Sequence, residues 1–335
     1  MLPERVKQDW NCGRFAPSTT GRVHPGTLLA ALLCWLDAKS KGAKIVLRLE
    51  DLDQERTRPG YVDQIERDLE WFGLEWDSRV LQSENRERHD AALLSLATEG
   101  RVYACDCSRR EIRERAERAP DGSYRYPGTC RKKTLSGRNI QAALASSDGP
   151  SLRLMLENDE VQLIDETGLD LSGDAAGLFG DPILRRRDGA YAYHFASVLD
   201  DEASGVDRIV RGRDLETSTI MQFTLGRILG FSPPVYRHHF LFLERAANGD
   251  PTKLSKLHGS VDLGNLRPRL TAMELCGRLA AFAGLVPVGA ECCPRDLVAE
   301  FDWSRVRRED LQLEWSSRAG LIAVEDDQRT CVRPD

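Results

Sequence analysis

The chain has 335 residues, of which 41% are hydrophobic, and a formal net charge of −6. This length and composition allow one large or two ordinary globular domains, and the negative charge excludes a protein that holds nucleic acid through an overall positive field. Because no uncharged apolar run reaches about 18 residues and the first residues lack the apolar centre of a secretory signal, we expect a cytoplasmic protein without membrane contact.

Strand and helix signals alternate through the first hundred residues. The sequence predicts strands over 13–16 and 44–50 and helices over 27–41, 61–72 and 84–98, joined by short segments that contain glycine. This alternation is typical of a parallel sheet with crossover helices. Residues 1–100 are therefore predicted to form the first half of an α/β, Rossmann-like catalytic domain.

The first of these helices begins with a candidate phosphate site. His24, Gly26 and Thr27 stand in or next to its first turn, shortly after the first predicted strand. A helix N-terminus offers free N–H groups and the positive end of the helix dipole to an anion. A lone His-x-Gly is usually incidental, so this pattern gains weight only from a second one further along the chain.

Residues 101–180 differ from the preceding part in composition and pattern, and are predicted to be an inserted subdomain. The segment starts rich in charge, Gly and Pro, and short alternating stretches follow around 151–167. Within it, three thiols and a phenol stand close together in sequence, on Cys105, Cys107, Tyr126 and Cys130. Thiolates suit zinc, and a structural zinc ion would stabilise a segment with few apolar residues. The alternative is three reduced cysteines without a metal.

The cysteines elsewhere are scattered, and their total of nine is odd. This usage does not resemble an oxidised disulfide framework, so reduced thiols are expected.

Residues 181–245 are predicted to complete the catalytic domain, with helices over 190–199 and 216–229 and a strand over 207–211. Residues 246–335 are predicted to be a loop followed by a small helical appendage, with helices over 270–283 and 302–315. In that loop Lys253 and Lys256 flank a serine, where both would reach a phosphoryl group. Alone, such a pair most often marks a solvated loop.

Five segments in the same order resemble the class I aminoacyl-tRNA synthetases for glutamate and glutamine: 13–26, 47–53, 191–201, 209–215 and 253–256. The cysteine pattern also resembles the acceptor-end insertion of that family. Three positions depart from the family pattern. Thr19 replaces a proline, Thr27 replaces the second histidine of the first signature, and Leu257 replaces the final serine of the second.

The resemblance implies a ligase that uses ATP with Mg²⁺ and carries one structural Zn²⁺. Its catalytic residues would be His24, Lys253 and Lys256, and ATP would bind at His24, Gly26, Thr27 and Lys256. Arginine forks suit the two carboxylates of glutamate, and a carboxylate suits its ammonium group. The implied glutamate pocket consists of Arg14, Phe15, Ala16, Pro17, Ser18, Glu50, Tyr193 and Arg211. The implied metal ligands are Cys105, Cys107, Tyr126 and Cys130.

Chain length separates two branches of this family. The resemblance implies that ordinary glutamyl-tRNA synthetases continue after the loop at 253–256 with large helical domains that read the anticodon, and we expect this chain of 335 residues to lack them. The chain resembles instead a truncated branch that activates L-glutamate without tRNA and attaches it to the queuosine base at the wobble position of tRNA(Asp). We expect a monomer. Two alternatives stay open: a compact glutamyl-tRNA synthetase that charges tRNA(Glu), and a catalytically silent RNA-binding protein derived from a synthetase.

Overall fold

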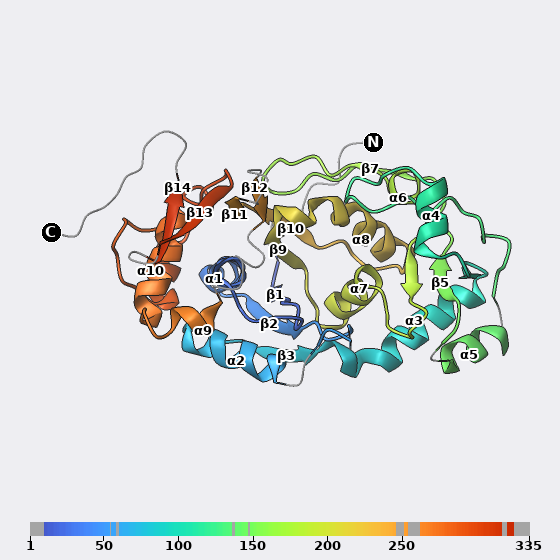
Figure 1. The fold of residues 1–335 in the computed structure, drawn as a ribbon, viewed down its shortest axis with the longest axis horizontal. Coiled ribbons are helices and arrows are strands. Elements are labelled where there is room, and N and C mark those ends of the chain that lie inside the picture. Colours follow the sequence, from blue (N-terminus) through green and yellow to red (C-terminus); the bar gives the residue numbers. More distant parts are fainter. Residues whose placement is uncertain are drawn as a thin grey trace.

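The computed structural model describes residues 10–53, 55–57, 60–135, 138–146, 148–245, 251–253, 262–316 and 320–324. Figure 1 shows an elongated molecule with a parallel sheet near its middle, the segment around α4 and α5 at one end and the C-terminal segment at the other. Among these residues, no helix is long and apolar enough to cross a membrane.

The central sheet has five parallel strands in the order β10-β9-β1-β2-β3. They are β1 (Cys12–Phe15), β2 (Lys44–Leu49), β3 (Ser78–Leu81), β9 (Arg208–Gly212) and β10 (Val235–His239). The chain builds outward from β1 to β3 and later returns to the other side of β1. The strand order therefore reverses between β1 and β9, which is where open α/β sheets bind ligands at the carboxyl ends of their strands.

Helices cover both faces of this sheet. One hydrophobic cluster joins the sheet to α1 (Pro25–Ser40), α2 (Tyr61–Trp71) and α10 (Ala272–Phe282), with Leu47 and Val210 as its strand residues. A second cluster joins the opposite face to α7 (Tyr193–Ala203) and α8 (Glu216–Ile228), with Val46 and Ile209. The predicted strands and helices of both halves are thus confirmed, with ends that shift by a few residues.

Alternation along the strands explains where the sheet's arginines point. Successive side chains of a strand face opposite sides of the sheet. Because Leu47 and Val210 face α1, the next residues, Arg48 and Arg211, face α7 and α8. Arg14 lies on the same side, since its guanidinium reaches Asp201 of α7.

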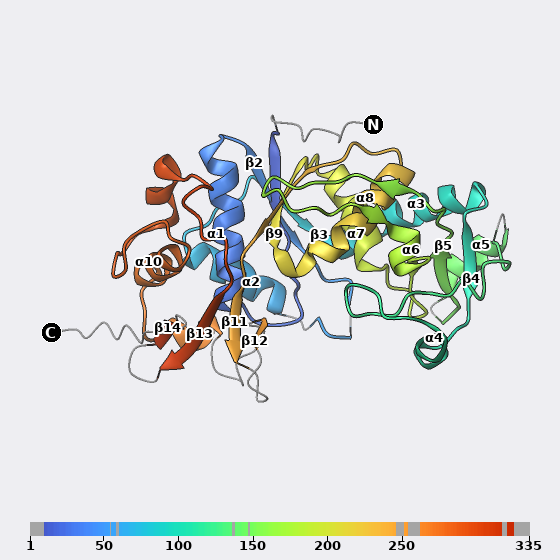
Figure 2. The same cartoon turned by 90° about the horizontal axis from the view of Figure 1, so that it is seen from above.

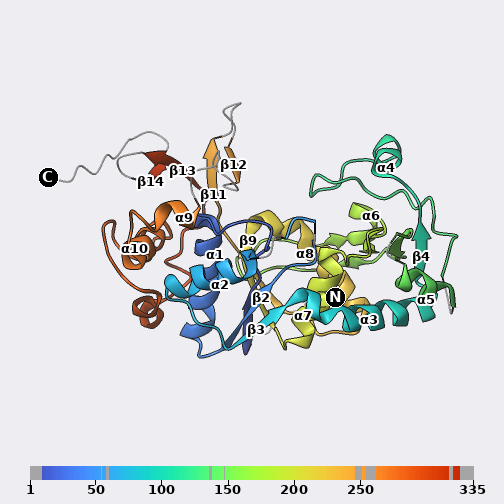
Figure 3. The same ribbon diagram turned by 60° about the horizontal axis from the view of Figure 1, so that its bottom comes forward.

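A separate antiparallel sheet follows the first half of the chain. It has the order β4-β5-β8 and comes between α3 (Arg86–Thr98) and α7 in sequence. Figure 3 shows α4 at its outer end, standing away from the rest of the molecule. The elements of this inserted segment are β4 (Val102–Cys105), α4 (Arg109–Arg115), α5 (Arg138–Ala145), β5 (Ser151–Leu154), β6 (Glu160–Val161), β7 (Gly173–Asp174), α6 (Ala175–Phe179) and β8 (Ile183–Arg185).

The C-terminal region contains strands as well as helices. α10 confirms the helix expected over 270–283, but the helix expected over 302–315 is wrong, because its last residues form β13 (Leu311–Ser316). Leu311 and Leu313 are buried whereas Glu314 is exposed, which is the two-residue period of a strand. Figure 2 shows β13 beside its sheet neighbours; the sheet order is β12-β11-β13-β14, with β11 (Phe242–Arg245), β12 (Pro251–Lys253) and β14 (Gly320–Val324).

Candidate active site

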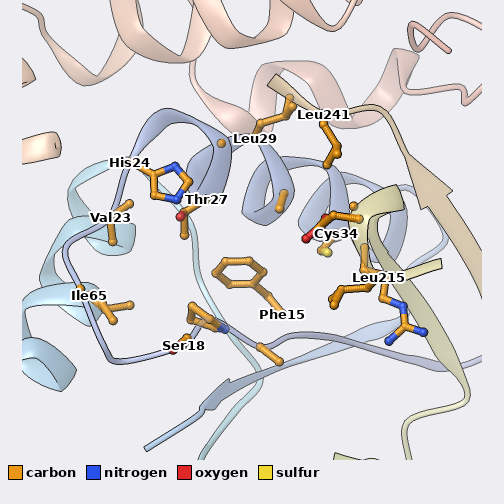
Figure 4. A pocket seen from close by; sticks show the side chains of 18 of the residues that line it. Phe15, Ser18, Val23, His24, Thr27, Leu29, Cys34, Ile65, Leu215 and Leu241 are labelled. Atoms are coloured by element: carbon orange, nitrogen blue, oxygen red, sulfur yellow. The ribbon is translucent and has the colours of Figure 1, made fainter. Parts of the chain in front are cut away.

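A cavity of about 660 Å³ lies at the carboxyl ends of β1 and β9. Its walls come from the segment after β1, the first turns of α1, the residues after β9 and the segment 239–242. Figure 4 shows His24 and Thr27 at the start of α1 on one side of Phe15, with Leu215 and Leu241 on the other. The cavity therefore occupies the switch point that the strand order creates.

This cavity brings together most of the residues predicted for glutamate and ATP. The predicted residues in its lining are Arg14, Phe15, Ala16, Pro17, Ser18, His24, Gly26, Thr27, Tyr193 and Arg211. They come from segments almost 200 positions apart, which only the parallel pairing of β1 with β9 makes neighbours. Their shared location agrees with one binding site, and their individual roles stay predictions.

Three other predicted residues are placed differently. Glu50 is not among the lining residues, but it adjoins them, because its N–H donates to the carbonyl of Pro17 at 3.1 Å and its own carbonyl accepts from Thr19 N–H at 3.1 Å. Lys253 ends β12, and its side chain is outside the described part of the structure. Lys256 lies outside the described residues.

The N-terminus of α1 faces the cavity. Its N-cap, His24, has an extended backbone and a carbonyl that accepts the N–H groups of Thr27 and Leu28 at 2.9 and 3.1 Å. Pro25 holds the first helical position and contributes no N–H group. The first turn contains no acidic residue, so nothing in it offsets the positive end of the dipole of this 16-residue helix. These features suit an anionic group such as a phosphate.

Arg211 is a buried cation in the cavity lining, with a relative exposure of 5%. Its guanidinium donates to Gln222 Oε1 at 2.6 Å, to Thr219 Oγ1 at 2.7 Å and to His238 Nε2 at 3.2 Å. All three partners are neutral acceptors, and within the described ranges no carboxylate forms an ion pair with Arg211. Burial accordingly lowers the pKa of Arg211. A buried cation without a counter-ion is costly, so the site favours a ligand that brings a carboxylate.

The other two arginines share the carboxylates of the site. Asp201 of α7 lies 3.6 Å from Arg14 Nε and also accepts from Arg48, whose second nitrogen lies 3.1 Å from Glu50 Oε1. Arg14 donates in addition to the carbonyl of Val210 at 2.9 Å. Asp201 thus orients two guanidinium groups from neighbouring strands.

Burial also affects the acids of this cluster. It raises the pKa of Glu50, although the nearby Arg48 opposes the shift. It raises the pKa of Tyr193 as well, and the Glu50 carboxylate adds to that rise. A ligand ammonium group beside Glu50 would favour its charged form, so binding of an amino acid and ionisation of this carboxyl group would support each other.

The predicted metal ligands also come together, in the inserted segment and outside the lining of this cavity. The sulfur atoms of Cys105, Cys107 and Cys130 all lie within 4.8 Å of one another, and those of Cys107 and Cys130 are 3.6 Å apart. Tyr126 Oη lies 3.3 Å from Cys105 Sγ and 3.8 Å from Cys107 Sγ. A tetrahedral zinc ion with bonds of about 2.3 Å to sulfur separates its sulfur ligands by roughly 3.8 Å. The donor set therefore fits zinc in both chemistry and spacing.

Sequence reasoning missed the side chains that hold the arginines. Asp201 entered only as part of a resembling segment, and Thr219, Gln222 and His238 were not singled out. An acidic residue on the buried side of an amphipathic helix is a signal that draws attention to Asp201. No comparable signal marks the partners of Arg211, because their types are common in any fold.

Comparison with known proteins places these features in context. The model of the family described as "tRNA synthetases class I (E and Q), catalytic domain" matches residues 12–269. The chain is 38% identical to the glutamyl-Q tRNA(Asp) synthetase of Symbiobacterium thermophilum, over 92% of this chain and 98% of that one. It is 41% identical to the protein of the same name from Nocardia farcinica, over 89% and 91% of the two chains. In structure, a glutamate-tRNA synthetase from Elizabethkingia anophelis superposes with a TM-score of 0.72 at 24% identity, over 91% of this chain and 68% of that one.

Proposed function

Because this chain belongs to the class I tRNA synthetases for glutamate and glutamine, and is a ligase of that family, we propose that it activates L-glutamate with ATP and attaches it to the queuosine base at the wobble position of tRNA(Asp). The activation step would need no tRNA. The observation that carries the proposal is the buried guanidinium of Arg211, which lines the cavity and has only neutral partners in the described structure. A dicarboxylic amino acid supplies the missing charge.

The geometry supports adenylate formation by positioning rather than by covalent catalysis. The α-carboxylate of glutamate would attack the α-phosphorus of ATP, and pyrophosphate would leave. Arg14, Arg211 and Tyr193 would hold the amino acid, while His24 and the start of α1 would hold the phosphates together with Mg²⁺. Lys253 at the end of β12 and Lys256, three residues later in the sequence, would stabilise the charge that grows on the phosphoryl oxygens.

The acceptor is proposed from the relatives, whose names specify glutamyl-Q and tRNA(Asp). Incubation of the protein with ATP, glutamate and queuosine-containing tRNA(Asp), followed by mass spectrometry of the nucleosides, is expected to show a glutamyl adduct of queuosine. A tRNA(Asp) transcript without queuosine is the matched control and is expected to stay unmodified. Glutamate on the 3′ end of tRNA(Glu) would instead indicate a compact glutamyl-tRNA synthetase. Absence of glutamate-dependent pyrophosphate exchange would indicate a silent protein.

We also propose that Cys105, Cys107, Cys130 and Tyr126 hold one structural zinc ion. The three sulfur atoms and the phenol oxygen converge from β4, the loop after it and the segment 126–130. In that position zinc would tie these three stretches of backbone together. The site lies outside the cavity lining, so the metal would act on stability and not on the reaction.

Replacement of Cys107 by serine is expected to remove the bound zinc and to lower the melting temperature, because a tetrahedral site loses one of its ligands. Zinc content is read by elemental analysis of the purified protein and stability by thermal unfolding. Cys293→Ser is the matched control, since Cys293 lies outside the cluster. One zinc per chain in both variants, or zinc absent from the wild type, would contradict the metal site.

A further inference from the structure

Asp165 links the inserted segment to the end of the central sheet. Its Oδ2 accepts the backbone N–H of His238 at 3.1 Å and lies 3.0 Å from His238 Nδ1. Its Oδ1 instead holds the turn that follows it, by accepting the N–H groups of Thr167 and Leu169 at 2.8 and 3.1 Å. Both Asp165 and His238 are buried. The two carboxylate oxygens thus have separate tasks, one toward the turn and one toward β10.

The other ring nitrogen of His238 faces the cavity arginine. Nε2 lies 3.2 Å from Arg211 Nε and 3.1 Å from Thr219 Oγ1. A guanidinium group can only donate, so Nε2 must accept and the ring proton must be on Nδ1, where Asp165 accepts it. The Asp165 carboxylate therefore determines the tautomer in which His238 can bind Arg211.

From this chain of contacts we infer that Asp165 and His238 are positioning residues that hold the Arg211 guanidinium in the orientation for the substrate carboxylate. The inference rests on the proposed function, since it concerns the same site. It assigns a role to a residue of the inserted segment, which reaches the glutamate pocket through one imidazole ring and without touching the ligand.

Protonation of His238 would remove the contact with Arg211. The groups that face this ring are Asp165 from the insertion, Thr219 of α8, and the cations Arg211 and Arg14 from β9 and β1. Burial lowers the pKa of His238, and the two cations add to this effect against the opposing Asp165 carboxylate. The neutral ring that the geometry requires is therefore also the form that its surroundings favour.

The test compares two amides at position 238. His238→Asn can keep a bond to Asp165 but is too short to reach Arg211 Nε, whereas His238→Gln can place an amide oxygen near the position of Nε2. We expect His238→Asn to raise the KM for glutamate in pyrophosphate exchange by about tenfold or more, because a poorly oriented guanidinium loses much of its binding energy. The KM for ATP should change less than about twofold, and His238→Gln should recover most of the loss.

Two further variants separate positioning from folding. Thr167→Ala removes a bond to Oδ1 of Asp165 and leaves Oδ2 in place, so it should not change the KM for glutamate. Asp165→Asn must turn its NH₂ group either toward the turn, where two backbone N–H groups oppose it, or toward His238, where one backbone N–H group opposes it and the ring can change its tautomer. We expect the second arrangement, which forces the wrong tautomer. It should therefore reproduce the glutamate defect even if His238→Asn fails to fold, which thermal unfolding reveals.

The outcomes distinguish the inference from the function on which it rests. A raised KM for glutamate, with little change in the KM for ATP, in both His238→Asn and Asp165→Asn supports the inference. Unchanged glutamate KM in both, or equal losses for glutamate and ATP, overturns it while the wild-type exchange activity still stands. If the wild type binds glutamate in calorimetry without any exchange activity, the proposed reaction is wrong. The variants are then compared by their dissociation constants for glutamate instead of by KM. If the wild type does not bind glutamate, both are overturned.

Discussion

Replacement of Arg211 by glutamine is expected to raise the KM for glutamate by roughly 100-fold or more, with little change in the KM for ATP. Glutamine keeps polar contacts with Gln222 and Thr219 but brings no charge to the cavity. A hydrogen bond to a charged group contributes about 1.5–3 kcal/mol, so loss of a bidentate pair with a carboxylate corresponds to about two to four orders of magnitude in affinity. Steady-state pyrophosphate exchange at varied glutamate measures the effect.

Arg213→Gln is the matched control for this experiment. Arg213 follows two residues later, lies 3.5 Å from Asp310 and is not part of the cavity lining. Its replacement should leave the KM for glutamate nearly unchanged, because the Arg213 side chain contacts Asp310 and the carbonyl of Arg308 and does not line the cavity. Similar losses in both variants would mean that Arg211 supports the fold and not the ligand, and the assignment of the cavity to glutamate would then lose its main support.

Local patterns were sufficient to predict the core of the fold. The apolar run of α1 and the alternating strand and helix periods fix element type from neighbours in the sequence, and the structure confirms them. The strand over Leu311–Ser316 was missed, because a short apolar stretch after charged residues does not distinguish a strand from a helix, and one of its two partner strands, β11, lies far away in sequence. β3 was missed because it is a four-residue edge strand in which no residue is buried.

The site residues that belong to sequence motifs could be predicted. The contacts that depend on how distant segments pack together could not. Arg14, His24 and Arg211 stand in segments with recognisable spacing, and the structure brings them to one cavity. The contact between Asp165 and His238 spans 73 positions and joins two ordinary residue types, so no spacing rule points to it. The contact between His238 and Arg211 likewise depends on the register of β9 against β10, which pairs these two residues.

The other large effect that we expect comes from Lys256, in the loop at 253–256. Lys256→Ala should lower the rate of glutamyl-adenylate formation by about 10²–10³-fold, because a donor aimed at developing phosphoryl charge acts mainly in the transition state. ATP binding should weaken far less, since the start of α1 still offers its N–H groups to the phosphates. Single-turnover measurements with labelled ATP separate the rate from the dissociation constant.

Lys41→Ala provides the comparison for a lysine outside the proposed chemistry. Lys41 is exposed at the C-terminal end of α1, opposite to the end that lines the cavity, so its loss should leave both the rate and ATP binding nearly unchanged. If Lys256→Ala weakened ATP binding and the activation rate by the same factor, the lysine would bind the ground state and the transition state equally. Its position in the Lys-x-Ser-Lys loop would then serve affinity for ATP, and the charge that grows on phosphorus would have to be stabilised by Lys253 and Mg²⁺ instead.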